Sequence, residues 1–167
     1  MERLIALLDR VSTLINRVLT AIAGTVLVLM VVLGSANVAL RGFGLPIQGT
    51  FEMMGFFGAI TAAFALGRTQ IKREHIAVDV VIQFFPSPVR RFLSGVSYVI
   101  GAVFFALAAW QTALWGTNLW RVNELSETLR IIYFPFVYCV SLGCLVLSLV
   151  LFIDMLKVLN GTGEVHS

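Results

Sequence analysis

Four long apolar runs, separated by short polar or charged links, dominate the pattern of hydrophobic and polar positions along the chain. The runs cover residues 18–40, 49–67, 92–120 and 131–153. A helix rises about 1.5 Å per residue and the hydrocarbon core of a bilayer is about 30 Å thick, so about 20 apolar residues suffice to cross it. The pattern therefore predicts an all-α membrane protein with four transmembrane helices.

The segment before the first run, Met1 to Arg17, alternates charged and apolar residues at helical spacing. This amphipathic pattern predicts a short N-terminal interfacial helix that leads into the membrane. A cleaved signal peptide is the alternative interpretation. We favour a retained span, because the apolar run that follows is longer than the roughly 7–15 residues of a signal peptide's hydrophobic region and no small-residue cleavage site follows it.

The link between the second and third runs is the least compatible with lipid. If residues 68–83 are helical, their polar side chains fall within about 80° of one another on the helical wheel. These side chains are Arg68, Lys72, His75, Asp79 and Gln83. We therefore predict an amphipathic segment on the cytoplasmic surface, which the prolines at 86 and 88 end. A short strand is less favoured, because an unpaired strand beside lipid leaves backbone groups unsatisfied.

Composition supports a lipid environment. Of 167 residues 59% are hydrophobic and 13% are charged, whereas soluble domains carry about 25% charged residues. We expect one membrane domain over residues 1–167. The net charge of +3 could suggest a nucleic-acid partner, but the charges lie at the ends of apolar runs, as membrane anchors do. No nucleic-acid partner is expected.

The distribution of Lys and Arg predicts the orientation. Nine of the 12 basic residues fall on one side of the predicted spans and three, Arg41, Arg121 and Arg130, on the other. The positive-inside rule then places both termini and the middle link in the cytoplasm. Aromatic residues that mark the outer interface are Trp115, Trp120, Tyr133 and Phe134.

Glu52 is a carboxylate at the mouth of the second apolar run, where a charge at membrane depth is costly unless it is paired. It follows Gly49 and Thr50, so it falls in the first helical turn, where the helix dipole favours a negative charge. Arg41, across the turn, is the expected partner. We interpret Glu52 as a structural anchor and not as a proton relay, because no other carboxylate lies within a span.

The second run also carries a stripe of small residues, Gly55, Gly58, Ala59, Ala62, Ala63 and Gly67. Small residues let helix backbones approach closely, which drives association in lipid. Two interpretations remain open: packing within the four spans, or docking onto a second membrane protein.

Catalytic and metal-binding motifs are weak. His75 and Asp79 lie one helical turn apart, but no third ligand accompanies them. Cys139 and Cys144 point about 140° apart on a helix, so a disulfide is not expected and apolar packing is the better interpretation. No Ser, His and acid pattern indicates nucleophilic catalysis. We predict no enzyme activity, no metal site and no cofactor in this chain.

An ordered set of residues resembles a known family. It comprises Arg41-Gly-Phe, Glu52, Gly58, Ala62, Arg68, His75-Ile76, Asp79, Pro86, Arg90-Arg91, Ile132-Tyr-Phe-Pro135 and Gly143. Their order and spacing resemble the DctQ-type small membrane subunit of tripartite ATP-independent periplasmic (TRAP) transporters over nearly the whole chain. Phe51 departs from the family pattern, in which an acidic or polar residue often precedes the glutamate.

The resemblance implies a small permease subunit of a sodium-coupled, binding-protein-dependent secondary transporter for organic acids in the bacterial inner membrane. Its implied partners are a large multi-span permease subunit, which would hold the sodium ions, a periplasmic substrate-binding protein and membrane lipid. On this interpretation the structural anchors are Arg41, Glu52, Arg68, Lys72, Arg73, His75, Asp79, Arg90 and Arg91, and the candidate docking residues for the binding protein are Arg121, Asn123, Glu124, Glu127 and Arg130.

Two other classes of function are the alternatives. A self-sufficient homo-oligomeric small carrier or channel would need polar residues along a path, and spans one, three and four supply few. A membrane enzyme would have to use Cys139 or Cys144.

Overall fold

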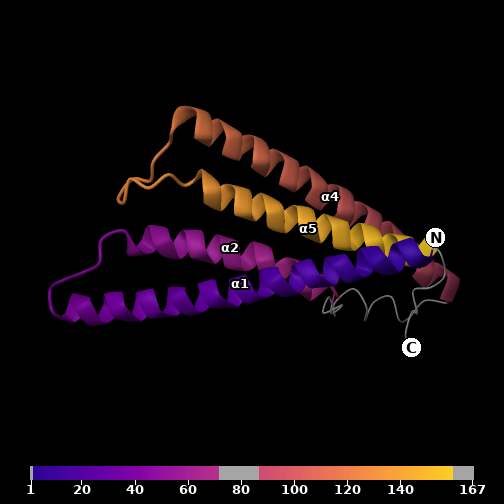
Figure 1. Ribbon diagram of the computed structural model, residues 1–167, viewed down its shortest axis with the longest axis horizontal. Helices are drawn as coiled ribbons and strands as arrows, with labels where there is room; N and C mark the ends of the chain where they lie inside the picture. The colour runs from indigo at the N-terminus through magenta and orange to yellow at the C-terminus, as the bar shows by residue number, and fades with distance from the viewer. Residues whose placement is uncertain (1, 72–86, 160–167) are drawn as a thin grey trace.

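The computed structural model describes residues 2–71 and 87–159, and all four of its elements are helices (Figure 1). They are α1 (Glu2–Gly42), α2 (Thr50–Ile71), α4 (Ser87–Val122) and α5 (Phe134–Leu159). Each contains an apolar stretch long enough to cross a bilayer. The prediction of an all-α protein with four spans is confirmed.

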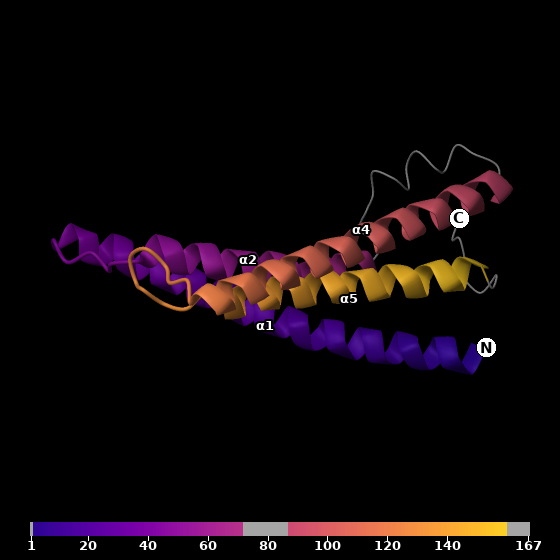
Figure 2. The ribbon, with the colours of Figure 1, turned by 90° about the horizontal axis from the view of Figure 1, so that it is seen from above.

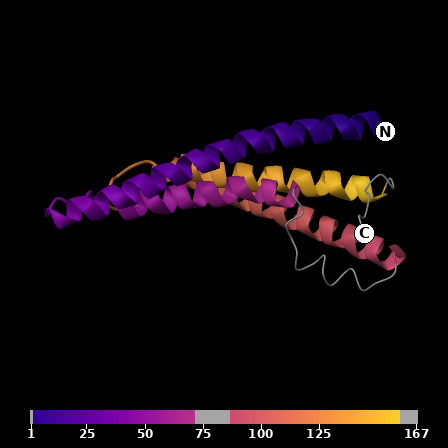
Figure 3. The same cartoon turned by 90° about the horizontal axis from the view of Figure 1, so that it is seen from below.

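The helices form two antiparallel hairpins, α1 with α2 and α4 with α5, and α5 packs against all three of the others. One end of the bundle holds the links 43–49 and 123–133, and we call it the loop end. The opposite end, the terminal end, holds the start of α1 and the end of α5 (Figure 1). Figures 2 and 3 show that α1, α4 and α5 spread apart towards the terminal end.

Helix boundaries differ from the predicted spans at several ends. Residues 2–17 and the first span form one continuous helix of 41 residues, so no break separates an interfacial segment, whose place at the membrane surface stays a prediction. Helix α4 begins at Ser87 rather than at 92. Pro88 falls in its first turn, where the missing N–H costs nothing. The predicted amphipathic segment lies largely in 72–86, outside the described residues.

The first hairpin turns at a glycine with left-handed backbone. Gly44 has φ +77°, its N–H donates to the Arg41 carbonyl at 3.1 Å, and the Leu45 N–H donates to the Leu40 carbonyl at 3.0 Å. This pair of bonds is a Schellman motif, which satisfies carbonyls left free at the end of α1. The Asn37 side-chain oxygen then accepts the Ile47 N–H at 2.9 Å and holds the turn against α1.

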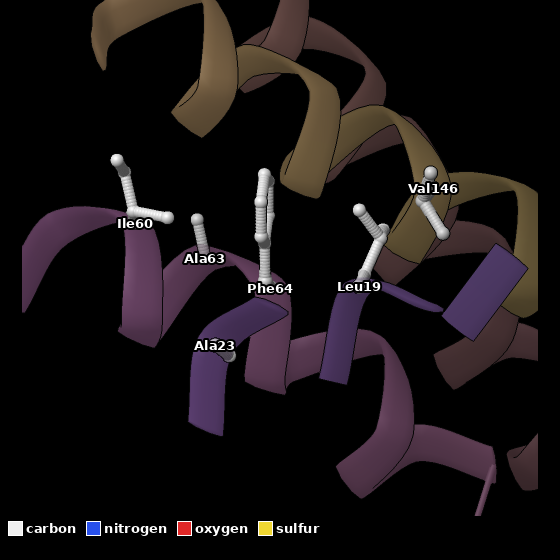
Figure 4. Close-up of a cluster of buried hydrophobic side chains, with 6 residues drawn as sticks. All are labelled: Leu19, Ala23, Ile60, Ala63, Phe64 and Val146. Carbon is white, nitrogen blue, oxygen red and sulfur yellow. The ribbon is translucent and has the colours of Figure 1, made fainter. Parts of the chain in front are cut away.

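The main apolar core lies where α1, α2 and α5 meet (Figure 4). Its buried members are Leu19, Ala23, Ile60, Ala63, Phe64 and Val146. Phe64 projects from α2 towards α5 in Figure 4. Because most other apolar side chains of the four helices face outward, this core is small and the protein relies on lipid or on partners to cover the rest.

Helices α4 and α5 are joined by hydrogen bonds as well as by apolar packing. Ser141 donates to the Ala109 carbonyl at 2.7 Å and Ser148 to the Ala102 carbonyl at 2.8 Å. The two serines lie two turns apart on one face of α5. Hydrogen bonds of this kind satisfy polar side chains inside lipid and fix the register between two helices.

Candidate interaction surfaces

The Glu52 carboxylate joins α2 to the link 123–133 at the loop end. Its Oε1 accepts the Thr128 N–H at 2.7 Å and its Oε2 accepts the Leu129 N–H at 3.1 Å. Glu52 lies in the first turn of α2, as predicted. Two charge-assisted bonds to adjacent backbone groups hold this loop in one position relative to α2.

Gly49 permits the same loop to pack closely on the start of α2. Its φ is +74°, and a Cβ at this position would overlap the Leu129 side chain. Its carbonyl accepts the first helical bond, from the Met53 N–H at 3.1 Å. A glycine is required here for two independent reasons, backbone conformation and space.

The expected ion pair between Arg41 and Glu52 is not formed, and this expectation was wrong. Arg41 is exposed at the end of α1, and across the described ranges 2–71 and 87–159 no ion pair joins it to Glu52. Backbone N–H groups of the facing loop satisfy the carboxylate instead. The residue types at 128 and 129 did not indicate these bonds, because every residue except proline has a backbone N–H.

All five candidate docking residues are exposed on or beside the link 123–133. They are Arg121, Asn123, Glu124, Glu127 and Arg130. Asn123 has φ +48° and follows the last turn of α4, so it has a helix-capping role of its own. The link itself is ordered by a hydrogen bond from the Ser126 N–H to the Ile131 carbonyl at 3.0 Å.

The small-residue stripe of α2 divides into an inward and an outward half. On the inward side Ala63 and Gly67 are buried. A Cβ on Gly143 of α5 would come within 2.6 Å of the Ala63 carbonyl oxygen, and a Cβ on Gly67 would overlap the Asn16 side chain of α1. These two positions pack within the bundle.

The outward half has no neighbour among the described helices. Gly55, Ala59 and Ala62 are exposed, and Gly58 is half-buried with nothing within 4 Å of where its Cβ would lie. Packing within the bundle accounts for the inward half, and docking of the outward half onto a second membrane protein stays a prediction. The outward half is a smooth strip against which another helix can lie closely.

A cluster of polar residues, which the sequence analysis missed, ties three helices together at the terminal end. Lys157 of α5 pairs with Asp9 of α1 and lies 3.8 Å from Asp154. The Gln70 amide of α2 donates to Asp154 at 3.4 Å, and both side chains are buried. The available signal was the Asp154 and Lys157 pair at the end of the last apolar run.

The other predicted anchors lie near helix ends or outside the described residues. Arg68 lies exposed in the last turn of α2, and Arg90 and Arg91 lie in the first turns of α4. Lys72, Arg73, His75 and Asp79 lie outside the described residues, so their predicted anchoring role stays a prediction.

Comparison with known proteins gives one family. The model of the DctQ component of tripartite ATP-independent periplasmic transporters matches residues 30–161. The matched range runs from within α1 to the end of α5 and includes the loop end and the outward half of the α2 stripe. No curated protein and no solved structure matches the chain.

Proposed function

The chain belongs to the DctQ family, the small component of tripartite ATP-independent periplasmic transporters, and from this membership we propose that it is the membrane scaffold of a sodium-coupled, binding-protein-dependent carrier for organic acids. It is a multi-pass membrane protein of a transporter family and not of an enzyme family. In the proposal, substrate and sodium bind in a large multi-span partner subunit, this chain holds no cofactor, and both termini lie in the cytoplasm of a bacterial inner membrane.

The observation that carries the proposal is the outward half of the α2 stripe, Gly55, Ala59 and Ala62. In lipid no hydrophobic force brings helices together, so association depends on close van der Waals packing. A strip without large side chains, left open by the described helices, supports its use as the contact for a helix of the large subunit.

The loop end supports a second part of the proposal, contact with the periplasmic binding protein. Glu52 and Gly49 fix the link 123–133 against α2, and the charged residues of the link remain exposed. A charged surface that is already ordered binds a partner at a smaller entropic cost than a flexible loop. Arg121, Glu124, Glu127 and Arg130 are the proposed contacts.

A self-sufficient carrier or channel is the alternative, and the described helices give it little support. Their buried polar side chains are Asn16, Thr50, Gln70, Ser141 and Asp154. Ser141 bonds the neighbouring helix and Gln70 bonds Asp154, and these contacts hold helices together instead of lining a path. Polar groups along a path are what conduction requires.

Co-expression with the large subunit tests the scaffold. Ala59→Trp places a large ring on the outward half of the stripe and should lower the recovery of the large subunit with this chain at least tenfold. Ala106→Trp adds the same ring to an exposed position of α4 and should leave recovery unchanged. Equal recovery with both variants would refute the α2 contact.

Reconstitution separates the two functions. Purified alone in vesicles, this chain should move no organic acid with or without a sodium gradient, and uptake should need the large subunit and the binding protein. Uptake by this chain alone would establish the carrier.

A further inference from the structure

Two arginines lie beside the contact between α1 and α2. Asn16 and Gly67 face each other, since a Cβ on Gly67 would overlap the Asn16 side chain. Arg17 and Arg68 are the next residues along each helix, and both are exposed. Two positive charges therefore lie close to each other, and no carboxylate within the ranges 2–71 and 87–159 forms an ion pair with either of them.

Helix geometry places both arginines on one side of the hairpin. Each step of one residue along a helix rotates the side-chain direction by about 100° about the helix axis. Asn16 and Gly67 point towards each other, and their helices run in opposite directions. The step to Arg17 and the step to Arg68 therefore turn both side chains to the same side of the hairpin. In α2, Ala63 and Gln70 lie about 40° and 60° from Gly67 in the opposite sense, and both contact α5. Arg17 and Arg68 therefore lie on the side of the hairpin that faces away from α5.

The arginines also lie at the depth of lipid headgroups. Residues 18–40 between Arg17 and Arg41 contain no charge, and at 1.5 Å per residue the two arginines are about 36 Å apart along α1. A hydrocarbon core of about 30 Å fits between them with an ordinary tilt. Arg68, beside Arg17, is then at the same membrane boundary.

An apolar track runs from the arginines into the membrane. Gly24, Val28 and Val31 lie within about 40° of Arg17 on the α1 wheel. Val28 is 61% exposed and Val31 58% exposed, and nothing lies within 4 Å of where a Gly24 Cβ would be. The track is long enough for an acyl chain, whereas a soluble anion would use only the arginines.

We propose that Arg17 and Arg68 together bind the phosphate of an anionic phospholipid whose acyl chain lies along Gly24, Val28 and Val31. Guanidinium groups suit this role, because each presents several donors to phosphate oxygens. Basic pockets between transmembrane helices are known sites for lipid headgroups. Arg10 lies two turns further out on the same face of α1 and is exposed, so it adds positive charge beside the site. The inference does not depend on the transport function.

The test measures phospholipid binding to the full-length chain in a mild non-ionic detergent. Native mass spectrometry during titration with phosphatidylglycerol should show one tightly held lipid per chain. Each basic group near an anionic lipid contributes about fivefold in affinity, so Arg17→Gln with Arg68→Gln should weaken this binding roughly thirtyfold. Arg17→Lys with Arg68→Lys keeps both charges and should retain most of it.

The matched control removes two charges from the loop end, Arg41→Gln with Arg121→Gln, and should bind the lipid as the unmodified chain does. An equal loss in this control would overturn the proposal, since net charge alone would explain the binding. Equal binding of phosphatidylcholine would overturn it, as would displacement of the lipid by millimolar inorganic phosphate, which would show a site for the free anion. Circular dichroism of each variant confirms that it is folded.

Discussion

Gly143 of α5 lies directly against the backbone of Ala63 in α2, with space for no side chain between them. The nearest atom to an added Cβ is a carbonyl oxygen at 2.6 Å, and a helix backbone cannot rotate away as a side chain can. We expect Gly143→Ala to lower the free energy of unfolding by roughly 1–3 kcal/mol. The measurement is the thermal midpoint of the purified chain in detergent.

The control for that prediction is Gly55→Ala, which adds the same methyl group to α2 where nothing lies within 4 Å. Because alanine favours a helix over glycine by about 0.5–1 kcal/mol, this variant should match or exceed the unmodified chain in stability. Equal losses in the two variants would show that α2 and α5 do not approach as closely as described.

Replacement of Glu52 by Gln should loosen the link 123–133. A carboxamide has one acceptor oxygen where the carboxylate has two, so the N–H of Thr128 or of Leu129 loses its partner. We expect amide hydrogen exchange at these two residues to become at least severalfold faster, read by mass spectrometry of peptides from the link. Glu127→Gln, a neutralisation on the same exposed link, should leave that exchange unchanged.

Lys157 should matter more to stability than Asp9, although the two form a pair. Asp9→Asn removes a half-exposed carboxylate and should cost about 0.2–1 kcal/mol. Lys157→Met also removes the positive charge 3.8 Å from the buried Asp154, so a larger loss of roughly 1–3 kcal/mol is expected. Thermal unfolding at low and high salt measures both; an Asp9 variant as unstable as the Lys157 variant would contradict the ranking.

Charge reversal on the loop end tests the proposed contact with the binding protein. Glu124→Arg with Glu127→Arg should lower uptake roughly tenfold. Reversing the charge of two residues at the rim of an interface replaces attraction by repulsion and so slows the association of the binding protein with this chain. The large subunit should be recovered with the chain as before. Undiminished uptake would exclude Glu124 and Glu127 from the docking surface. If they are part of that surface, a higher concentration of the binding protein should restore uptake by the variant.

The four apolar runs were enough to predict the four helices, because a segment that crosses lipid must form its backbone hydrogen bonds within itself, as a helix does. Their ends were less predictable. Pro88 suggested the end of one segment, whereas it lies in the first turn of α4, and a proline suits either place. Likewise charge at Arg17 suggested a boundary in α1, but an arginine on the lipid side can reach the headgroups without breaking the helix.

Contacts between distant parts of the chain could not be predicted from the sequence. The bonds to Glu52 come from the backbone of Thr128 and Leu129, which any residue could supply. The pair of Asp9 and Lys157 joins residues 148 positions apart, and nothing local distinguishes it from two solvated charges. The stripe on α2 was visible in the sequence, but the division into two faces depends on where α1 and α5 lie.

The central position of α5 has a consequence for how the protein is made. The hairpin of α1 and α2 can form as soon as α2 has entered the membrane, because the contacts between these two helices involve early segments alone. Helix α4 packs mainly on α5, which leaves the ribosome after the other described helices. Ala63 of α2 and Asp9 of α1 also contact α5, through Gly143 and Lys157. Assembly of the four-helix bundle therefore waits for the synthesis of α5, and a chain released before Phe134 would leave both earlier parts without the helix that joins them.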